Sequence, residues 1–414
     1  MTRCVDVAIV GGGIAGSTLA IVLGRAGVKV AIVEREGVFR DRVRGEALMP
    51  WGTALARELG VLDALAASSC HPLPIWQTYL DREPREPYDW RPDVPTGDGL
   101  WGVSHPGLQE VLLRRAIDSG ATVLRPAKAL RRTRGGAGRI VVPVQCDLGQ
   151  TEIRARLVVA ADGAESGART WIGAKTVRDP VHQFIGGCLI DDVDLDPDAA
   201  HVGYVAGGSA MMFRQASGKA RAYLVARPET AQSMRGPAVA PALIAACARA
   251  LPDGALRRAR AVGPAAFFPG ADVLADRIAG DGVVLIGDAA GANDPTQGQG
   301  LSLVFKDVRE ISQLLLNTDD WQTAIAEFAR LRPRWYEPLR AHAMWEAPLV
   351  TGIGAAADAA RERVARAKEL NPLRGGYGTI HALGPDHLPV TEEARRHYLG
   401  EDLVELGLAT TFGQ

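Results

Sequence analysis

The segment Val5–Glu34, VDVAIVGGGIAGSTLAIVLGRAGVKVAIVE, decides the fold of this 414-residue chain. Residues 7–10 form an uncharged apolar run rich in β-branched side chains, which predicts a strand buried inside a parallel sheet. A helical pattern follows to about Arg25, and residues 28–33 predict a second strand. The segment is therefore predicted to be a strand–helix–strand unit, with the acidic residue Glu34 at its carboxyl end.

Three glycines with GxGxxG spacing, Gly11, Gly13 and Gly16, join the first strand to the helix. In such a loop the first allows a tight turn, the second lets the backbone approach a pyrophosphate, and the third lets helix and strand pack closely. The N-terminus of the helix offers N–H groups and a partial positive charge to that pyrophosphate. Glu34 follows about twenty residues later, where an acid accepts hydrogen bonds from an adenosine ribose. The segment predicts a dinucleotide site and leaves NAD and FAD equally possible.

The composition excludes several other classes of function. The 47 basic and 48 acidic residues are dispersed and give a net charge of -1, so neither a nucleic-acid partner nor a membrane surface is predicted. The five cysteines form no CxxC pair, and no histidine pair has metal-ligand spacing, so no metal is expected. The uncharged run from residue 7 to residue 23 fits the nucleotide loop better than a signal or membrane segment. The sequence therefore predicts a cytoplasmic protein.

Two later stretches also follow predicted buried strands. In DGAESGAR, residues 162–169, Asp162 and Gly163 are compatible with an ordinary turn when taken alone. In GDAAGANDPTQGQG, residues 287–300, an aspartate and a small loop precede an amphipathic helix. Such a loop suits an anion at the helix N-terminus, and Asp288 at a strand end suits a diol.

The residues between these stretches change character. The runs 184–190, 203–214 and 220–226 alternate or are β-rich, which predicts an antiparallel sheet and a separate lobe. Along residues 211–214, alternation places Met211 and Phe213 on one side, and Met212 and Arg214 on the other. Either the two sides are a core face and a solvent face, or one of them forms the wall of a substrate pocket.

Three strand-end sites on one sheet are better explained by one long ligand than by NAD. FAD needs a pyrophosphate site, a place for the ribityl diol and a place for the isoalloxazine ring. The three motifs, in this order and spacing, resemble those of the class A flavoprotein monooxygenases, the aromatic hydroxylase family with the p-hydroxybenzoate hydroxylase fold. The resemblance covers about residues 5–315.

The resemblance implies an α/β protein with a Rossmann-like FAD-binding domain, an inserted antiparallel β-sheet substrate lobe and a helical C-terminal region. The expected FAD-binding domain is discontinuous and comprises residues 1–70, 101–175 and 271–315. Residues 71–100 and 176–270 form the expected substrate lobe, and residues 316–414 the helical region.

The resemblance also implies which residues bind FAD. They lie in the glycine loop, at the end of the second strand, in the loop after it and in the two later motifs: Gly11, Gly13, Ile14, Ala15, Gly16, Glu34, Arg35, Arg44, Gln109, Asp162, Gly163, Gly287, Asp288, Pro295, Gly298, Gly300 and Leu301. The chain departs from the family at Gly291, where a histidine is usual, and at His105, where an arginine is common. Gln109 is expected to replace that arginine.

In the implied mechanism, FAD takes a hydride from NAD(P)H and O2 then forms a flavin C4a-hydroperoxide, which hydroxylates or epoxidises an electron-rich aromatic or polyketide-like molecule. No protein nucleophile is required, and the candidate pocket residues are Tyr204, Met212, Arg214, Phe268 and Pro295. The alternatives are a flavin-dependent reductase of the prenyl-chain saturating type, a flavin-dependent halogenase and, least favoured, a non-enzymatic FAD-binding protein. The WxWxIP motif of the halogenases is missing from the sequence. A monomer or homodimer is expected.

Overall fold

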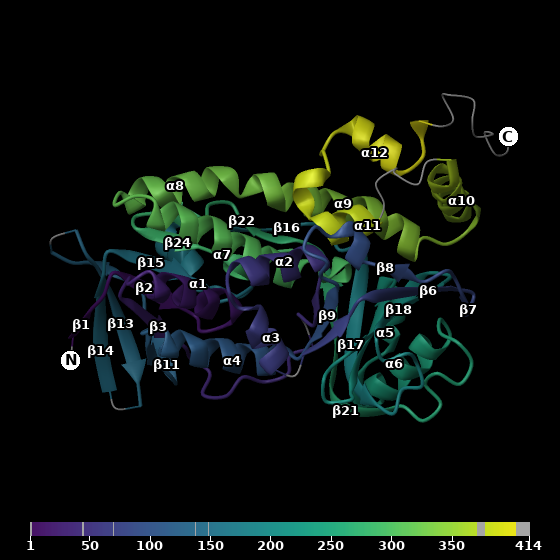
Figure 1. Cartoon of the computed structure of the whole chain (residues 1–414), viewed down its shortest axis with the longest axis horizontal. Coiled ribbons are helices and arrows are strands. Elements are labelled where there is room, and N and C mark those ends of the chain that lie inside the picture. The colour runs from purple at the N-terminus through teal and green to yellow at the C-terminus, as the bar shows by residue number, and fades with distance from the viewer. Residues whose placement is uncertain are drawn as a thin grey trace.

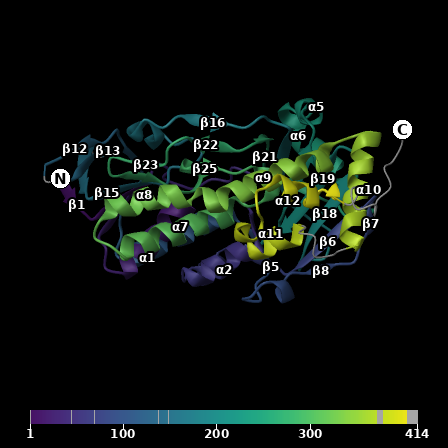
Figure 2. The same cartoon turned by 90° about the horizontal axis from the view of Figure 1, so that it is seen from above.

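The computed structural model describes residues 2–43, 45–68, 70–136, 138–147, 149–370 and 377–402. The molecule is elongated, with an α/β part that contains the N-terminus and a second part built on a large sheet (Figure 1). Long helices from the later part of the chain lie along both parts (Figure 2).

The α/β part is built on a six-stranded sheet of order β10-β3-β2-β15-β24-β23, in which β23 alone pairs antiparallel. Its strands are β2 (Val7–Val10), β3 (Val30–Val33), β10 (Thr122–Leu124), β15 (Leu157–Ala160), β23 (Ala279–Gly280) and β24 (Val283–Leu285). The second strand begins two residues later than predicted. Since β2, β15 and β24 are neighbours and parallel, the loops at their carboxyl ends meet at one edge of the sheet. The three predicted motifs are thus brought together.

Each face of this sheet is covered by a different layer. On one face α1 (Ile14–Arg25) packs against α4 (His105–Asp118) and α7 (Gly300–Leu316). The other face shares an apolar core with a five-stranded sheet. That sheet consists of β1 (Thr2–Cys4), β11 (Ala127–Ala129), β12 (Thr133–Arg134), β13 (Ile140–Cys146) and β14 (Gly149–Ala155).

The second part is built on an eight-stranded sheet of order β21-β17-β20-β19-β18-β6-β7, with β8 paired to β6. Its strands are β6 (Ile75–Leu80), β7 (Glu83–Pro84), β8 (Tyr88–Asp89), β17 (Gln183–Asp191), β18 (Ala199–Val205), β19 (Gly208–Arg214), β20 (Ala220–Ala226) and β21 (Arg260–Gly270). The predicted run 203–214 is therefore a hairpin of two strands. One face packs on α6 (Val239–Ala248) through a separate apolar core.

Smaller elements connect the two parts. Two three-stranded sheets are formed by β4 (Ala47–Leu48), β5 (Cys70–Leu73) and β9 (Leu100–Val103), and by β16 (Thr176–Arg178), β22 (Val273–Ala275) and β25 (Gly291–Ala292). The short helices are α2 (Pro50–Glu58), α3 (Leu62–Ala67) and α5 (Pro228–Ser233), with 3-10 turns at η1 (Arg91–Asp93), η2 (Ala168–Ile172), η3 (Gly236–Ala238), η4 (Gly287–Ala289), η5 (Pro295–Gln297) and η6 (Pro385–His387).

The C-terminal part is helical. Its helices are α8 (Trp321–Leu331), α9 (Pro333–Thr351), α10 (Ala355–Leu370), α11 (Tyr377–Leu383) and α12 (Glu392–Tyr398). The first two follow each other almost end to end along the molecule, and α11 lies beside α2 (Figure 2). Among the described helices, none is both long and apolar enough to cross a membrane.

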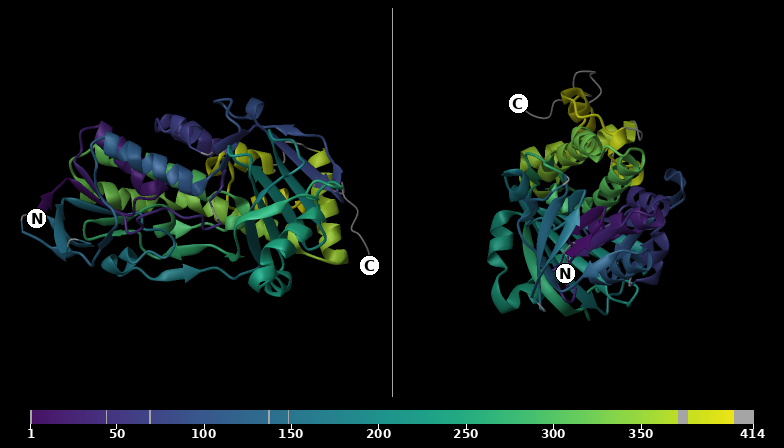
Figure 3. Two further views of the ribbon diagram at one scale, coloured as in Figure 1. Left: turned by 90° about the horizontal axis from the view of Figure 1, so that it is seen from below. Right: turned by 90° about the vertical axis from the view of Figure 1, so that its left-hand side faces the viewer.

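The strands divide between the two large sheets along the predicted segments. Every strand of the six-stranded sheet comes from residues 1–70, 101–175 or 271–315. Every strand of the eight-stranded sheet comes from 71–100 or 176–270. The β-rich insertion and the sheet that it interrupts lie side by side along the length of the molecule (Figure 1 and Figure 3, left). The predicted α/β fold with an inserted β-sheet lobe and a helical tail is confirmed. The sheet of this lobe is not purely antiparallel as predicted, because β6 pairs parallel with β18.

Candidate functional site

A cavity of about 660 Å³ runs from the glycine loop to the eight-stranded sheet. At the nucleotide end of the cavity, the loop between β2 and α1 packs closely against neighbouring backbone atoms. Gly11 has φ +101°, and a Cβ atom there would lie 2.3 Å from the carbonyl oxygen of Ala161. A Cβ atom at Gly16 would lie 2.0 Å from the carbonyl oxygen of Gly11. Glycine is therefore required at both positions for the loop and α1 to pack as they do.

The carboxylate of Glu34 is buried at the carboxyl end of β3 and lines the cavity. Its Oε2 accepts the N–H of Gly12 and its Oε1 the N–H of Glu36, both at 2.7 Å. These bonds fix the carboxylate beside the glycine loop, and each oxygen keeps a further lone pair for a ribose hydroxyl. Arg35 and Gln109 line the same end of the cavity.

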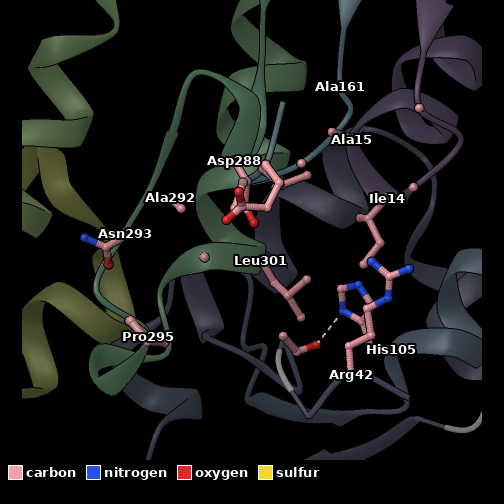
Figure 4. Close-up of a pocket in the computed structure, with 18 of the residues that line it drawn as sticks. Ile14, Ala15, Arg42, His105, Ala161, Asp288, Ala292, Asn293, Pro295 and Leu301 are labelled. Carbon is pink, nitrogen blue, oxygen red and sulfur yellow. Dashed lines mark hydrogen bonds between the residues drawn. The ribbon is translucent and has the colours of Figure 1, made fainter. Parts of the chain in front are cut away.

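The middle of the cavity is bounded by the loops that follow β15 and β24. Arg169 joins these loops because its guanidinium donates to the carbonyl oxygens of Asp288 (2.9 Å), Ala289 (2.9 Å) and Ala164 (2.8 Å). Asp288 lies between the glycine loop and the Asn293–Pro295 segment (Figure 4). Asp162 and Gly163 line the cavity as well. Arg169 thus connects the loops that carry the two predicted strand-end sites and stabilises their position relative to each other.

At the far end, the cavity is bordered by the loop 292–298 and the N-terminus of α7. The first turn of this 17-residue helix carries no acidic side chain, so the helix itself supplies no carboxylate that would neutralise its positive end. The loop is tied to the eight-stranded sheet, because Gln183 of β17 donates to Thr296 at 2.8 Å. Pro295, Gly298, Gly300 and Leu301 all line the cavity.

Helix α9 explains the departure at Gly291. A Cβ atom at this position would lie 3.2 Å from Arg332, Leu274 and Tyr336. Arg332 is buried and its Nε donates to Asp307 Oδ2 at 2.9 Å, while Asp307 also accepts the N–H of Gly287 at 2.9 Å. Arg332, Leu274 and Tyr336 thus fill the space beside residue 291. Asp307 of α7 holds the start of the third motif through the N–H of Gly287.

A second buried acid, Asp272, connects the loop 292–298 to α9 through hydrogen bonds. Its Oδ1 accepts the hydroxyl of Tyr336 at 2.7 Å and the amide of Asn293 at 2.9 Å. Burial raises the pKa of Asp272 to about 6, and the hydrogen bonds from Tyr336 and Asn293 oppose that rise.

The wall on the eight-stranded sheet is apolar and aromatic. Its cavity-lining residues come from five strands: Trp76, Ile185, Met211, Phe213, Tyr223, Phe268 and Pro269. His381, a fully buried residue of α11, adds a ring from the C-terminal helices. Its ring centroid lies 6.4 Å from that of Trp76.

Most of the predicted site residues line the cavity. They are Gly11, Gly13, Ile14, Ala15, Glu34, Arg35, Gln109, Asp162, Gly163, Phe268, Asp288, Pro295, Gly298, Gly300 and Leu301. Gly16 and Gly287 lie behind the lining and act through backbone packing. The prediction for Arg44 falls outside the described residues.

Three of the predicted pocket residues, Tyr204, Met212 and Arg214, lie outside the lining of this cavity. Met212 points to the opposite face of β19 and packs with α6. Arg214, on the same side of the strand, donates to the carbonyl oxygen of Gly218 at 3.2 Å. Tyr204 is half-buried at the end of β18. The pocket face of β19 is the one with Met211 and Phe213, because α6 covers the other.

Sequence reasoning missed the residues that lie far from the three motifs. Trp76, Tyr223, Glu46 and His381 line the cavity, and neither spacing nor a motif marks them. Glu46 follows Arg44 in a stretch that was predicted to contact FAD only through that arginine. The acidic residue in a largely apolar segment, RGEALMP, was the one available signal.

The residues present fit FAD. Asp162, Asn293 and Gln297 line the cavity, and each has one buried side-chain oxygen with no hydrogen-bond partner among the described residues. These acceptors match a ligand rich in hydroxyl and imide donors. The glycine loop has no room for a Cβ atom at Gly11 or Gly16, and the N-terminus of α1 offers backbone N–H groups to a pyrophosphate. No group of three metal-ligating side chains occurs within the described part of the chain.

Residues 4–318 match the family described as FAD binding domain. The chain therefore belongs to this family, FAD is its cofactor, and the predicted resemblance to the class A flavoprotein monooxygenases is confirmed.

Among characterised relatives, the chain is 28% identical to squalene monooxygenase of Mus musculus over 352 residues, which are 81% of this chain and 59% of that protein. It thus spans about three fifths of the length of that relative. It is 30% identical to digeranylgeranylglycerophospholipid reductase 2 of Methanopyrus kandleri over 80% of this chain and 82% of the relative. The solved structure of p-nitrophenol 4-monooxygenase from Pseudomonas putida DLL-E4 matches with a TM-score of 0.72 and 19% identity over 98% of both chains, which shows a shared fold.

Proposed function

We propose that the protein is an FAD-dependent, NAD(P)H-consuming monooxygenase that hydroxylates or epoxidises an electron-rich aromatic or polyketide-like small molecule. One observation carries this proposal: a single cavity joins the nucleotide loop to an aromatic wall. An oxygenating flavin needs its ring at such a junction, where water is excluded from the reacting atoms. We further propose a cytoplasmic protein that acts as a monomer or homodimer.

FAD, when bound, supplies the redox chemistry by accepting a hydride from NAD(P)H and passing electrons to O2. Gly11, Gly13 and Glu34 would hold its ADP half, and Asp162 and Asp288 its middle. The positive N-terminus of α7 would stabilise negative charge on the reduced ring through backbone N–H groups. Trp76, Phe213 and other residues of the sheet would hold the substrate and keep water away.

A reductase is the second candidate function, because the archaeal reductase is 30% identical over four fifths of this chain. A reductase would use the same FAD site but would saturate a double bond without consuming O2. A halogenase is less favoured, because the sequence lacks the WxWxIP motif. A protein that binds FAD without catalysis would bind the cofactor and show no substrate-stimulated NAD(P)H oxidation.

The test combines cofactor content with oxygen labelling. The purified protein is expected to be yellow, and electron-rich aromatics and polyketides are screened for stimulated NADH or NADPH oxidation. Under 18O2 the product of a monooxygenase carries one labelled oxygen atom. Label found only in water or peroxide argues against oxygenation, and a reduced product without O2 uptake supports the reductase. A protein that binds no added FAD would refute the whole proposal.

A further inference from the structure

The wall of the cavity on the eight-stranded sheet includes a polar pair, formed by Tyr223 of β20 and the neighbouring Glu46. Tyr223 lies among aromatic neighbours, with its ring centroid 6.2 Å from that of Phe213, which lies 6.5 Å from Trp76. The Tyr223 hydroxyl donates to Glu46 Oε2 at 3.1 Å. Both residues line the cavity, although Glu46 is only 2% exposed. The hydroxyl–carboxylate pair thus borders an otherwise apolar part of the cavity.

The pair is held from behind by Arg221 and Asp41. Arg221 Nη2 donates to Glu46 Oε1 at 2.6 Å and to Asp41 Oδ2 at 2.7 Å. Arg221 is 1% exposed and is not among the residues that line the cavity. Its single positive charge is therefore shared by two carboxylates and does not face the cavity. Glycine at position 187 makes room for the Tyr223 ring, since a Cβ atom there would lie 2.7 Å from it.

No lysine or arginine of the eight-stranded sheet is among the described residues that line the cavity. The lining cations come from other segments of the chain: Arg35, Arg40, Arg42, Lys128 and Arg178. The described charged groups beside Tyr223 are Glu46, Asp41 and Arg221, and their summed charge is negative, or neutral when Glu46 is protonated. A substrate carboxylate placed there would face Glu46, and among the described residues the sheet contributes no cavity-lining cation to compensate it. Like charges at close range in a buried site are strongly disfavoured.

We infer that Tyr223 and Glu46 form the polar anchor of the substrate pocket, which selects an apolar ring system bearing a hydrogen-bond-donating hydroxyl and rejects ring systems bearing a carboxylate. Arg221 and Asp41 are positioning residues for this anchor. The inference rests on the proposed function and specifies its substrate class: neutral hydroxylated aromatics rather than aromatic acids. A hydroxyl can donate to Glu46 or to Tyr223 Oη, whereas an unsubstituted ring leaves the buried carboxylate without its additional partner.

The protonation state of Glu46 should make ligand binding at the polar anchor depend on pH. Burial raises the pKa of Glu46 to about 7, and the positive charge of Arg221 opposes this rise. The other charged or titratable groups facing Glu46 are Asp41, whose charge raises that pKa further, and Tyr223, whose hydrogen bond lowers it. Below about pH 7 the carboxyl becomes neutral, so its repulsion of a carboxylate ligand should weaken.

The test measures binding to the oxidised FAD-loaded protein without NAD(P)H, by the change that a ligand causes in flavin absorbance. Three matched probes are used: 2-naphthol, naphthalene and 2-naphthoate. At pH 8 the wild type is expected to bind 2-naphthol about tenfold or more tighter than naphthalene, and 2-naphthoate most weakly. Between pH 8 and pH 6 the affinity for 2-naphthoate should rise several-fold, because Glu46 becomes neutral while the probe stays ionised.

Two variants and a control complete the test. Glu46→Gln should bind 2-naphthoate about tenfold tighter and lose the pH dependence, and Tyr223→Phe should reduce the preference for 2-naphthol over naphthalene to about threefold or less. Asp98→Asn is the control, since Asp98 is a buried acid that pairs with Arg57 and lies outside the cavity lining. It should leave all three affinities unchanged.

Equal binding of the three probes by the wild type would overturn the inference, as would 2-naphthoate binding best with no change over pH. These measurements remain decisive if Glu46→Gln does not fold, because the wild-type pH series and Tyr223→Phe test the same pair. A failure here, combined with 18O2 incorporation into some substrate, would leave the monooxygenase proposal intact. Absence of FAD binding would instead refute the proposed function.

Discussion

Substituting alanine for the third glycine of the nucleotide loop should weaken FAD binding through steric displacement alone. At Gly16 the new Cβ atom would lie 2.0 Å from the carbonyl oxygen of Gly11, so helix and loop must separate by about 1 Å. Overpacking of this kind costs about 1–3 kcal/mol of stability. The same displacement moves the backbone N–H groups that face the pyrophosphate. If the same cost falls on binding, the Kd for FAD should rise about 5–150-fold, since each 1.4 kcal/mol corresponds to a factor of ten.

Two further substitutions separate the steric effect from backbone strain. Gly27, at the other end of α1, has φ +81°, and a Cβ atom added there would meet no atom within 4 Å, so Gly27→Ala introduces strain without a clash. It should cost about 1 kcal/mol of stability and leave FAD affinity unchanged. Gly11→Ala combines both effects, since φ is +101° and the Cβ atom would lie 2.3 Å from the Ala161 carbonyl oxygen. It should be the most severe of the three.

The assay is titration of the apoprotein with FAD, followed by flavin fluorescence, together with urea unfolding of each apoprotein. The expected order of FAD affinity is wild type and Gly27→Ala, then Gly16→Ala, then Gly11→Ala. If Gly16→Ala binds FAD within threefold of Gly27→Ala, the close approach of helix and loop is not what holds the pyrophosphate site. In that event the steric argument for the loop is refuted, even if both variants are destabilised.

Three other substitutions test the rest of the site. Asp288→Ala should lower FAD occupancy, with a loss of about 1–3 kcal/mol in binding measured by flavin titration, whereas Asp288→Asn should retain more of it; equal occupancy in both would contradict a role for the carboxylate. Arg332→Ala leaves the buried Asp307 without its cation and should lower the free energy of unfolding by about 3–5 kcal/mol, measured by urea unfolding. An unchanged unfolding midpoint would show that this ion pair does not stabilise the packing of α7 and α9. Because the pKa of Asp272 is raised to about 6 in the folded protein, the folded state holds that proton more tightly than the unfolded state. The free energy of unfolding should therefore fall by about 3 kcal/mol as pH rises from about 3 to about 7. Asp272→Asn should lose this component, and an identical pH profile would show that Asp272 does not supply it.

Sequence reasoning located the nucleotide end of the site because the signals there are local. The glycines, the strands on either side and Glu34 all lie within one continuous unit, and each backbone requirement is met by residues near it in the chain. The two later motifs were found in the same way, since each is a strand followed at once by its loop. Their convergence at one sheet edge followed from parallel strand order.

The substrate end was predicted less well because both faces of the inserted sheet are buried. All but the last residue of β19 are buried, since α6 covers one face and the cavity lies on the other. Alternation then no longer distinguishes the core side from the pocket side, and Met212 and Arg214 were predicted where the structure places Met211 and Phe213. The correct pair was one of the two faces that alternation defined.

The sequence by itself determined the strand–helix–strand unit, the three motifs and hence FAD, because these depend on backbone geometry within short segments. Only the tertiary structure decided which side of the inserted sheet faces the flavin site and which distant residues meet there. Glu46 and Tyr223 are 177 positions apart and are joined by one hydrogen bond. His381 reaches the cavity from a helix near the C-terminus. Such contacts are set by how helices and sheets pack, which no local pattern encodes.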